Sequence, residues 1–492
     1  MRPQFIRKCR SPWGEIAALA LLVSMSSILL RAEDTAPLPG TTEPNRVDSL
    51  WGVTELIHPT AALRGAASCA SSGCHGGPRA GVSSVLAPRG SEYPLFLESD
   101  PHGRSWRTLN SAASIEILTK LGILSDGSIV QPAAYENCLA CHNTDRSLSI
   151  DGISPNRAEG VACESCHGPS EAWYDQHYQG PESVWRAKTE LGLVDTKPLL
   201  QRARACALCH VGAKDRDMNH DIIAAGHPAL YFDMAVYHEA YPKHWRDPEA
   251  GTESFRAKLW LAGQIAKADA ELELLQARAA KTHSVSVWPE FAQYQCTSCH
   301  NTLDGQPRTT LEPSIDWEVL GRASVRRWNL QGTDLLIAND DNAKDSELSV
   351  LLGELLASLH DSSARPEQIS RDAQSLRAAV ATTLTSKQPS ILTQWNSESQ
   401  RLIAIQQLQE AIPTLNWEQA ALAYVAAWSA SQPMASPELQ PPMNTVRNGL
   451  LFPFRSQSPF FPRSETPIVP PSRPEWTQAV SRVIQSLEKV GP

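Results

Sequence analysis

Ten cysteines in five close pairs are the residues of this sequence whose types and spacing could do chemistry. In every pair the second cysteine is followed at once by a histidine. Four pairs have the spacing C-x-x-C-H, and the fifth, in the stretch CASSGCH, has four residues between its cysteines. The eleventh cysteine, Cys9, lies near the start of the chain. The five groups are Cys69/Cys74/His75, Cys138/Cys141/His142, Cys163/Cys166/His167, Cys206/Cys209/His210 and Cys296/Cys299/His300.

Four chemistries use cysteine pairs of this kind: a disulfide framework, a zinc site, a redox-active dithiol and the covalent attachment of haem. Disulfides explain the even count in an exported chain, but not a histidine at one fixed position. Zinc ribbons do not need that histidine, and a thioredoxin-like dithiol needs only one C-x-x-C. Haem c attachment uses all three residues, because the thiols add to the porphyrin vinyl groups and the histidine binds the iron. The spacing therefore predicts four covalent haems, and a fifth at Cys69/Cys74 unless that pair forms a local disulfide.

Further histidines could bind the opposite faces of these irons. Nine histidines lie outside the motifs, and seven of the nine fall between the first and the last cysteine pair. A second histidine makes an iron a low-spin, six-coordinate electron carrier, whereas an open face makes a site for small molecules. Methionine is a poor competitor, because Met434 and Met443, two of the four that follow residue 32, lie far from the motifs. We therefore predict bis-histidine ligation.

Several stretches around these histidines resemble one known family. The segments ESDPHGRSW, GVACESCHGPS with WYDQH downstream, and CALCHVG followed by NHDIIAAGHPALYFDMAVY are similar to the multihaem c-type cytochromes of the cytochrome c-554 family, over roughly residues 60–305. The resemblance implies that His102, His177, His220 and His227 are distal ligands, and His244 in YPKHW is a further candidate. We expect the other four histidines to be structural: His58, His238, His283 and His360. The chain departs from the type protein in one more candidate haem motif and a long C-terminal extension.

The start of the chain has the pattern of a secretory signal. Basic residues precede an apolar run from Ile16 to Leu30, and Ala32 offers a small residue for cleavage. The alternative is a retained membrane anchor, for which this run is short. After cleavage no spanning helix would remain, so we expect an exported, periplasmic protein. The formal charge of −9 argues against a nucleic-acid-binding protein, which would need a basic surface. It favours redox protein partners that present basic patches.

The sequence between and beyond the motifs predicts a mainly α fold. Around the motifs, Gly and Pro punctuate short helices, and porphyrin faces would replace part of the core. Apolar residues at helical spacing predict a long helix over 255–281, and a leucine stripe over 348–359 begins a series of amphipathic helices. The predicted parts are a signal peptide over 1–32, a flexible tether over 33–60, a multihaem cytochrome c domain over 61–305, a helical bundle domain over 306–432, an extended Pro-rich strap over 433–474 and a C-terminal helix over 475–492.

Two functions fit this pattern. The first is an exported cytochrome that transfers single electrons between redox partners through closely spaced bis-histidine haems. The alternative is a multihaem oxidoreductase in which one open-faced iron acts on a small nitrogen or sulfur compound. The absence of a C-x-x-C-K motif, which would supply a lysine ligand, favours the carrier.

Overall fold

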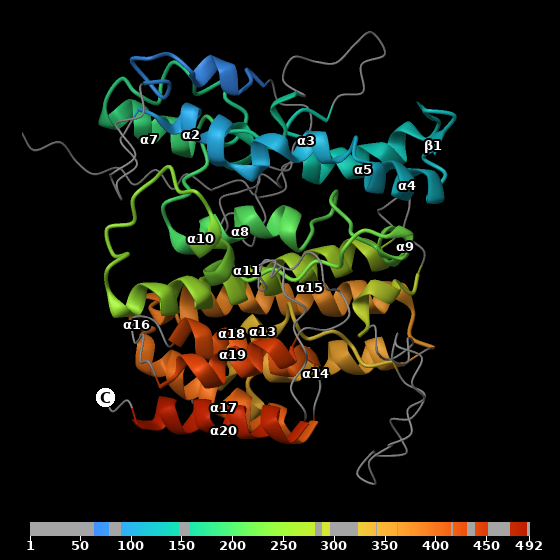
Figure 1. Ribbon diagram of the computed structural model, residues 1–492, viewed down its shortest axis with the longest axis vertical. Coiled ribbons are helices and arrows are strands. Elements are labelled where there is room, and N and C mark those ends of the chain that lie inside the picture. Colours follow the sequence, from blue (N-terminus) through green and yellow to red (C-terminus); the bar gives the residue numbers. More distant parts are fainter. Residues whose placement is uncertain are drawn as a thin grey trace, which may run out of the picture. The chain divides into compact units, whose positions relative to one another are not determined.

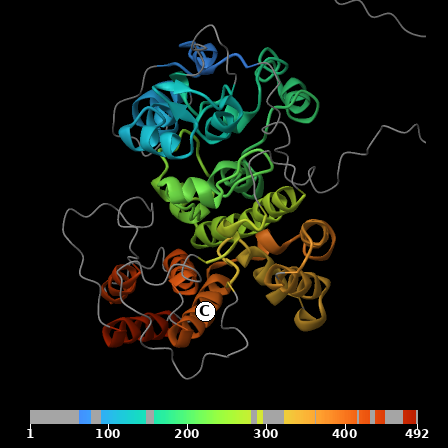
Figure 2. The ribbon, with the colours of Figure 1, turned by 90° about the vertical axis from the view of Figure 1, so that its right-hand side faces the viewer.

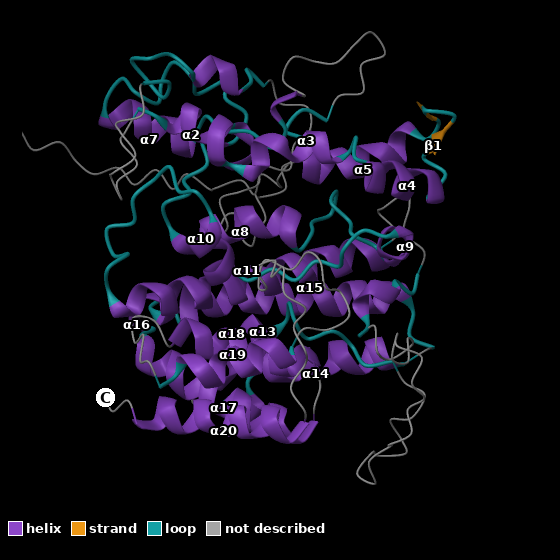
Figure 3. Ribbon diagram, in the orientation of Figure 1, coloured by secondary structure: helices purple, strands orange, loops and turns teal. Residues whose placement is uncertain are grey.

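The computed structural model of the protein describes residues 63–77, 90–146, 158–280, 288–295, 323–340, 342–361, 363–414, 417–430, 438–450 and 473–489. The fold is mainly α, as the sequence predicts (Figure 3). Within these residues the strands form one antiparallel hairpin of β1 (Leu124–Ser125) and β2 (Ser128–Ile129). No helix in the described ranges is long and apolar enough to cross a bilayer.

Three of the cysteine motifs lie at the C-terminal ends of helices. Helix α5 (Pro132–His142), α6 (Glu164–His167) and α8 (Leu199–His210) each end on the motif histidine. Cysteines three residues apart on a helix lie one above the other, so both thiols of a pair face the same side. The other elements of this region are η2 (Ala66–Cys69), α2 (Glu92–Ser99), η3 (Pro101–Arg104), α3 (Ser105–Thr108), α4 (Ala112–Lys120), α7 (Pro181–Thr189), α9 (His220–Ala225), α10 (Met234–Ala240) and η5 (Phe291–Gln293).

Helix α11 (Glu253–Ala279) confirms the long helix predicted over 255–281. It packs against α8 on one side and against α15 (Pro366–Thr382) on the other, as both Figure 1 and Figure 2 show. The helix is buried nearly all round, since Lys267 and Asp269 are as inaccessible to solvent as Trp260. Helix α11 therefore joins a helix that carries a cysteine motif to the C-terminal helices.

The C-terminal helices pack mainly in pairs. Helix α14 (Glu347–His360) buries Leu348, Leu352, Leu355 and Leu359 against its neighbours, which confirms the leucine stripe. It packs on α15, whereas α17 (Ser397–Thr414) packs on α18 (Trp417–Ala430). The remaining elements are α13 (Gln331–Ala338), η6 (Ala343–Asp345), η7 (Thr383–Lys387), α16 (Ile391–Gln394), α19 (Gln440–Gly449) and α20 (Arg473–Lys489). Buried apolar residues from Val194 to Leu487 in the sequence form one continuous core.

One predicted element differs from the structure. The prolines between 433 and 474 predict an extended strap, but Gln440–Gly449 form helix α19. Its prolines, Pro441 and Pro442, lie in the first turn of the helix. Backbone N–H groups in a first turn have no hydrogen-bond partner within the helix, so proline loses no helical hydrogen bond there. The predicted signal peptide and tether, and the boundary at 305/306, lie outside the described residues and stay predictions.

Candidate haem sites

Histidines in the described part of the chain come together in four pairs. Each pair joins the histidine of a cysteine motif to a histidine predicted as a distal ligand. The ring centres are 6.2 Å apart in His75–His177, 6.4 Å in His167–His244, 6.1 Å in His210–His102 and 6.3 Å in His142–His227. A metal–nitrogen bond of about 2 Å, plus about 1.1 Å from that nitrogen to the ring centre, would hold two rings about 6.2 Å apart across one metal. All four separations match this requirement.

The protein occupies the Nδ1 atom of five of these histidines. Each Nδ1 lies within hydrogen-bonding distance of an oxygen, and an Nδ1–H that donates to this oxygen leaves Nε2 as the nitrogen available to iron. The contacts are His75 to Glu92 at 3.2 Å, His102 to Asp100 at 2.9 Å, His142 to Thr108 Oγ1 at 3.0 Å and the Ser105 carbonyl at 3.2 Å, His177 to the Tyr174 carbonyl at 2.6 Å and His227 to the Pro228 carbonyl at 2.9 Å. The ring orientation of each is therefore fixed by its own surroundings.

Burial also keeps motif histidines neutral. Desolvation, followed by the neighbouring His244, lowers the pKa of His167 to about 4. Desolvation and the nearby His102 lower the pKa of His210 to about 3. Because only the neutral imidazole binds a metal, these rings are in the ligating form at neutral pH.

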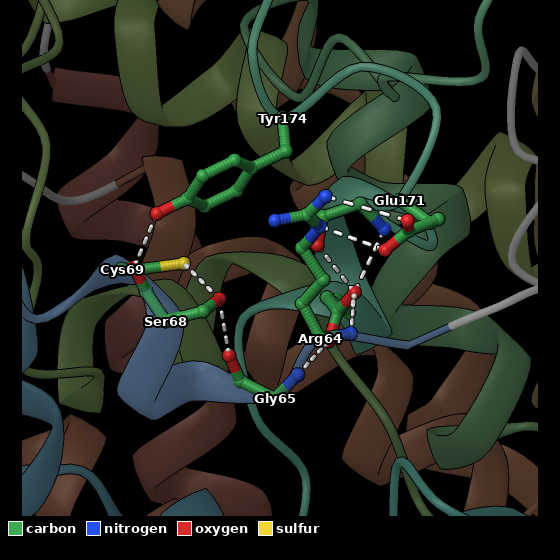
Figure 4. Close-up of polar contacts among 8 residues, drawn as sticks. Arg64, Gly65, Ser68, Cys69, Glu171 and Tyr174 are labelled. Carbon is green, nitrogen blue, oxygen red and sulfur yellow. Dashed lines mark hydrogen bonds and ion pairs between the residues drawn. The ribbon is translucent and has the colours of Figure 1, made fainter.

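The motif with the longer spacer is held by a distant segment of the chain. Cys69 ends η2, and the contacts around it are drawn in Figure 4. The Tyr174 hydroxyl donates to the Ser68 carbonyl at 2.6 Å, and the Arg64 Nε donates to Glu171 at 2.7 Å. Because Tyr174 also orients His177, the same turn fixes both the loop of the motif and the histidine that faces it.

A buried carboxylate strengthens this connection. Glu164, in α6 between two motif cysteines, accepts hydrogen bonds from the backbone N–H of Arg64 at 3.1 Å and of Gly65 at 2.8 Å. It also accepts from the backbone and the hydroxyl of Ser170 at 2.7 Å each. A carboxylate that satisfies several N–H groups in this way joins the first motif directly to the third.

Thiols of different motifs approach one another. Cys69 and Cys163 lie close enough to shift each other's pKa, and so do Cys141 and Cys209. Cys206 likewise lies close enough to Cys166 to raise the pKa of that thiol, although burial is the larger cause. These contacts bring the histidine pairs into a continuous order, from His75/His177 through His167/His244 and His210/His102 to His142/His227.

The donor set fits haem better than zinc. Across the described ranges, no three Cys, His, Asp or Glu side chains converge as a zinc site would need. Apart from the main core, the apolar clusters around the motifs are small: one centres on Tyr135 and Leu139, the other on Phe96. A porphyrin at each histidine pair would supply apolar surface that these clusters lack.

One further histidine predicted as a distal ligand, His220, has different surroundings. His220 begins α9, where Asn219 caps the helix by accepting from the backbone N–H of Ile222. The backbone N–H of His220 donates to Glu290 at 2.8 Å, and its ring lies 5.7 Å from that of Phe291. The fifth motif itself, Cys296, Cys299 and His300, lies outside the described residues.

His238 is structural, as expected from the sequence. It is buried in α10, and its Nε2 contacts Asp247 at 3.1 Å and Arg202 at 3.3 Å. The nitrogen that would bind iron is therefore occupied. Sequence reasoning missed two residues beside the sites, Asp100 and Tyr241. The position of Asp100 two residues before a histidine was a usable signal, whereas nothing in the sequence pointed to Tyr241.

Paired histidines beside paired thiols are the residues that a covalently bound haem of the c type requires. Residues 90–168 match the model of a family described as cytochrome c554 and c-prime. This match supports a c-type cytochrome with covalently bound haem that takes part in electron transfer. The matched stretch includes His102 and the motifs of α5 and α6. No curated protein and no solved structure matches the chain.

Proposed function

We propose that this cytochrome carries five haems c and passes single electrons between redox proteins along a row of bis-histidine sites. The observation that carries the proposal is the common separation, 6.1–6.4 Å, of four histidine pairs from eight different places in the chain. Haem bound in this way supplies reversible one-electron oxidation and reduction of iron.

The roles of the residues follow from their positions. The cysteine pairs hold the cofactor covalently, and the histidine after each pair binds the iron from one side. His177, His244, His102 and His227 bind from the other side, in the order of the sites given above. With both axial positions filled by protein, an iron has no place for a substrate. The four described pairs therefore favour an electron carrier over an enzyme.

We assign the fifth site to Cys296, Cys299 and His300, with His220 as the distal ligand. In support, Glu290 and Phe291, which contact His220, stand only a few residues before Cys296. Because α9 holds His220 and the loop that follows it holds His227, the fifth site would extend the row beyond His142/His227.

The proposal includes export of the protein and binding of its acidic surface to basic surfaces of redox partners. The N-terminal signal pattern and the covalent haem support maturation outside the cytoplasm, as is typical of the family. The net charge of −9 supports electron exchange with partners that present basic surfaces. Such docking should weaken as ionic strength rises.

Intact-mass spectrometry of the purified holoprotein, followed by peptide mapping, tests the cofactor assignment. We expect the mass of the chain without residues 1–32 plus five haems, with one haem on the peptide that holds Cys69 and Cys74. Four haems and an internal disulfide in that peptide would refute the assignment of the first site. Fewer than four haems, or bound zinc, would refute the proposed function.

A further inference from the structure

Asp100 is a buried carboxylate beside one of the histidine pairs. Its side chain is 6% exposed and lies between α2 and η3. One oxygen, Oδ1, accepts from His102 Nδ1 at 2.9 Å and from the His102 backbone N–H at 2.9 Å. The other, Oδ2, accepts from the Tyr241 hydroxyl. Among the described residues, no lysine or arginine forms an ion pair with Asp100, so its charge is shared only with an imidazole and a phenol.

The surroundings of the other paired histidines are different. His177 and His227 donate Nδ1–H to neutral backbone carbonyls. His75 faces a carboxylate, that of Glu92, but the side chains of the pair are 45% and 23% exposed, and water screens their interaction. Asp100 is thus the buried acidic partner of a histidine among the described pairs.

Asp100 also lies at a junction between two sites. The Tyr241 ring is 5.6 Å from that of His102 and 6.3 Å from that of His244. The carboxylate and the phenol that donates to it therefore stand between the His210/His102 pair and the His167/His244 pair.

Two arginines lie where the His210/His102 site meets the His142/His227 site. Arg216 is buried, and its Nε donates to the Ala140 carbonyl at 2.9 Å, inside the motif of α5. Arg216 and Arg146 act electrostatically on Cys141 and on Cys209. Cys209 belongs to the His210/His102 site and Cys141 to the His142/His227 site, and Arg146 is itself paired with Asp215, so these arginines act on both sites.

Two physical effects of Asp100 act in the same direction. A carboxylate on Nδ1 makes the imidazole a stronger electron donor to a metal at Nε2. A buried negative charge also favours the more positive, oxidised state of a nearby iron, and low dielectric strengthens that preference. Both effects lower a reduction potential.

We propose that Asp100, acting through His102, lowers the reduction potential of the haem of His210/His102. Asp100 is a positioning residue that acts through the Nδ1 atom of His102. This inference rests on the proposed function.

Spectropotentiometric titration at fixed pH tests the inference in three variants. Asp100→Asn keeps the size and one acceptor oxygen but removes the charge. It should raise the potential of one low-spin centre by at least a tenfold change in its reduction equilibrium, about 59 mV for one electron. Tyr241→Phe removes the donor to Oδ2, leaves more charge on Oδ1 and should lower the potential of the same centre. Glu92→Gln, the exposed counterpart, should shift a different centre by less than threefold.

The possible outcomes show whether Asp100 changes the reduction potential of a haem through His102. Opposite shifts of one centre in Asp100→Asn and Tyr241→Phe support the inference. A full complement of low-spin haems in Asp100→Asn with unchanged potentials would overturn it. Loss of the low-spin spectrum of one haem in Asp100→Asn, with no shift in Tyr241→Phe, would also overturn it by making Asp100 a purely structural residue. The haem count and spin state of the unaltered protein test the proposed function separately, so the two failures are distinguishable.

Discussion

Replacing Asp269 with asparagine should cost the protein about 3–5 kcal/mol of its free energy of unfolding, the usual cost of removing one partner from a buried ion pair. Asp269 lies on α11 and is 1% exposed. It accepts from Arg204 Nε of α8 at 2.7 Å and from Arg377 Nε of α15 at 2.7 Å. Asparagine keeps the shape and one acceptor but leaves the two arginines with Glu273 as their remaining acid. One positive charge is then buried without a counter-charge.

Urea denaturation, followed both by far-ultraviolet circular dichroism and by the haem absorbance, measures this loss. Both signals should fall at the same lower urea concentration, because the network joins a helix with a cysteine motif to the C-terminal helices. The control is Glu171→Gln, which breaks the more exposed Arg64–Glu171 pair and should cost less than about 1 kcal/mol.

The double variant Asp269→Asn with Arg377→Met sharpens the test. Removing the second arginine lets Arg204 pair with Glu273, at 2.5 Å, and restores charge balance. The double variant should therefore be more stable than Asp269→Asn alone by at least about 1 kcal/mol. A loss below about 1 kcal/mol in the single variant, or full additivity in the double, would refute the reasoning.

Three further predictions follow from other contacts. His244→Ala should convert one low-spin haem to high-spin, because it removes the partner of His167. The control His238→Ala should leave every haem low-spin, because His238 contacts Asp247 and Arg202 instead. Identical electron paramagnetic resonance spectra for the two variants would contradict the pairing. Burial lowers the pKa of Lys267 to about 8 from an ordinary value of 10.5, so the unfolded chain binds this proton more tightly and stability should rise with pH between those values. Lys267→Met should abolish that rise in urea melts at several pH values; an undiminished rise in the variant would show that another group is responsible. Gly332→Ala should lower the free energy of unfolding by about 1–3 kcal/mol, because a Cβ there would lie 2.3 Å from the Gln264 backbone oxygen of α11. Gly353→Ala on α14, with open space around it, should raise the free energy of unfolding by about 0.5–1 kcal/mol. Equal thermal midpoints for the two variants would exclude the close approach at Gly332.

The chemistry of the cysteine motifs could be predicted from sequence because it is local. A thiol pair and its histidine are adjacent in the chain, and their spacing alone indicates the cofactor. The long helix at 253–279 and the leucine stripe of α14 were predictable for the same reason, since a helical period is visible within one segment.

The pairing of the histidines could not be predicted, because it depends on how distant segments pack. His102 comes before the α5 motif in sequence but lies beside His210 of α8, and His142 lies beside His227. The burial of Lys267 and Asp269 was equally hidden, since charged residues on a helix normally indicate a solvated face. Helix α19 was missed because prolines at its first turn and prolines in extended chain give the same composition.

Low-temperature electron paramagnetic resonance of the oxidised holoprotein, with spins counted against iron, tests the central claim most directly. The account predicts that at least four ferric haems per chain are low-spin, one for each histidine pair at 6.1–6.4 Å. A count of fewer than four low-spin haems in fully loaded protein would contradict the bis-histidine sites.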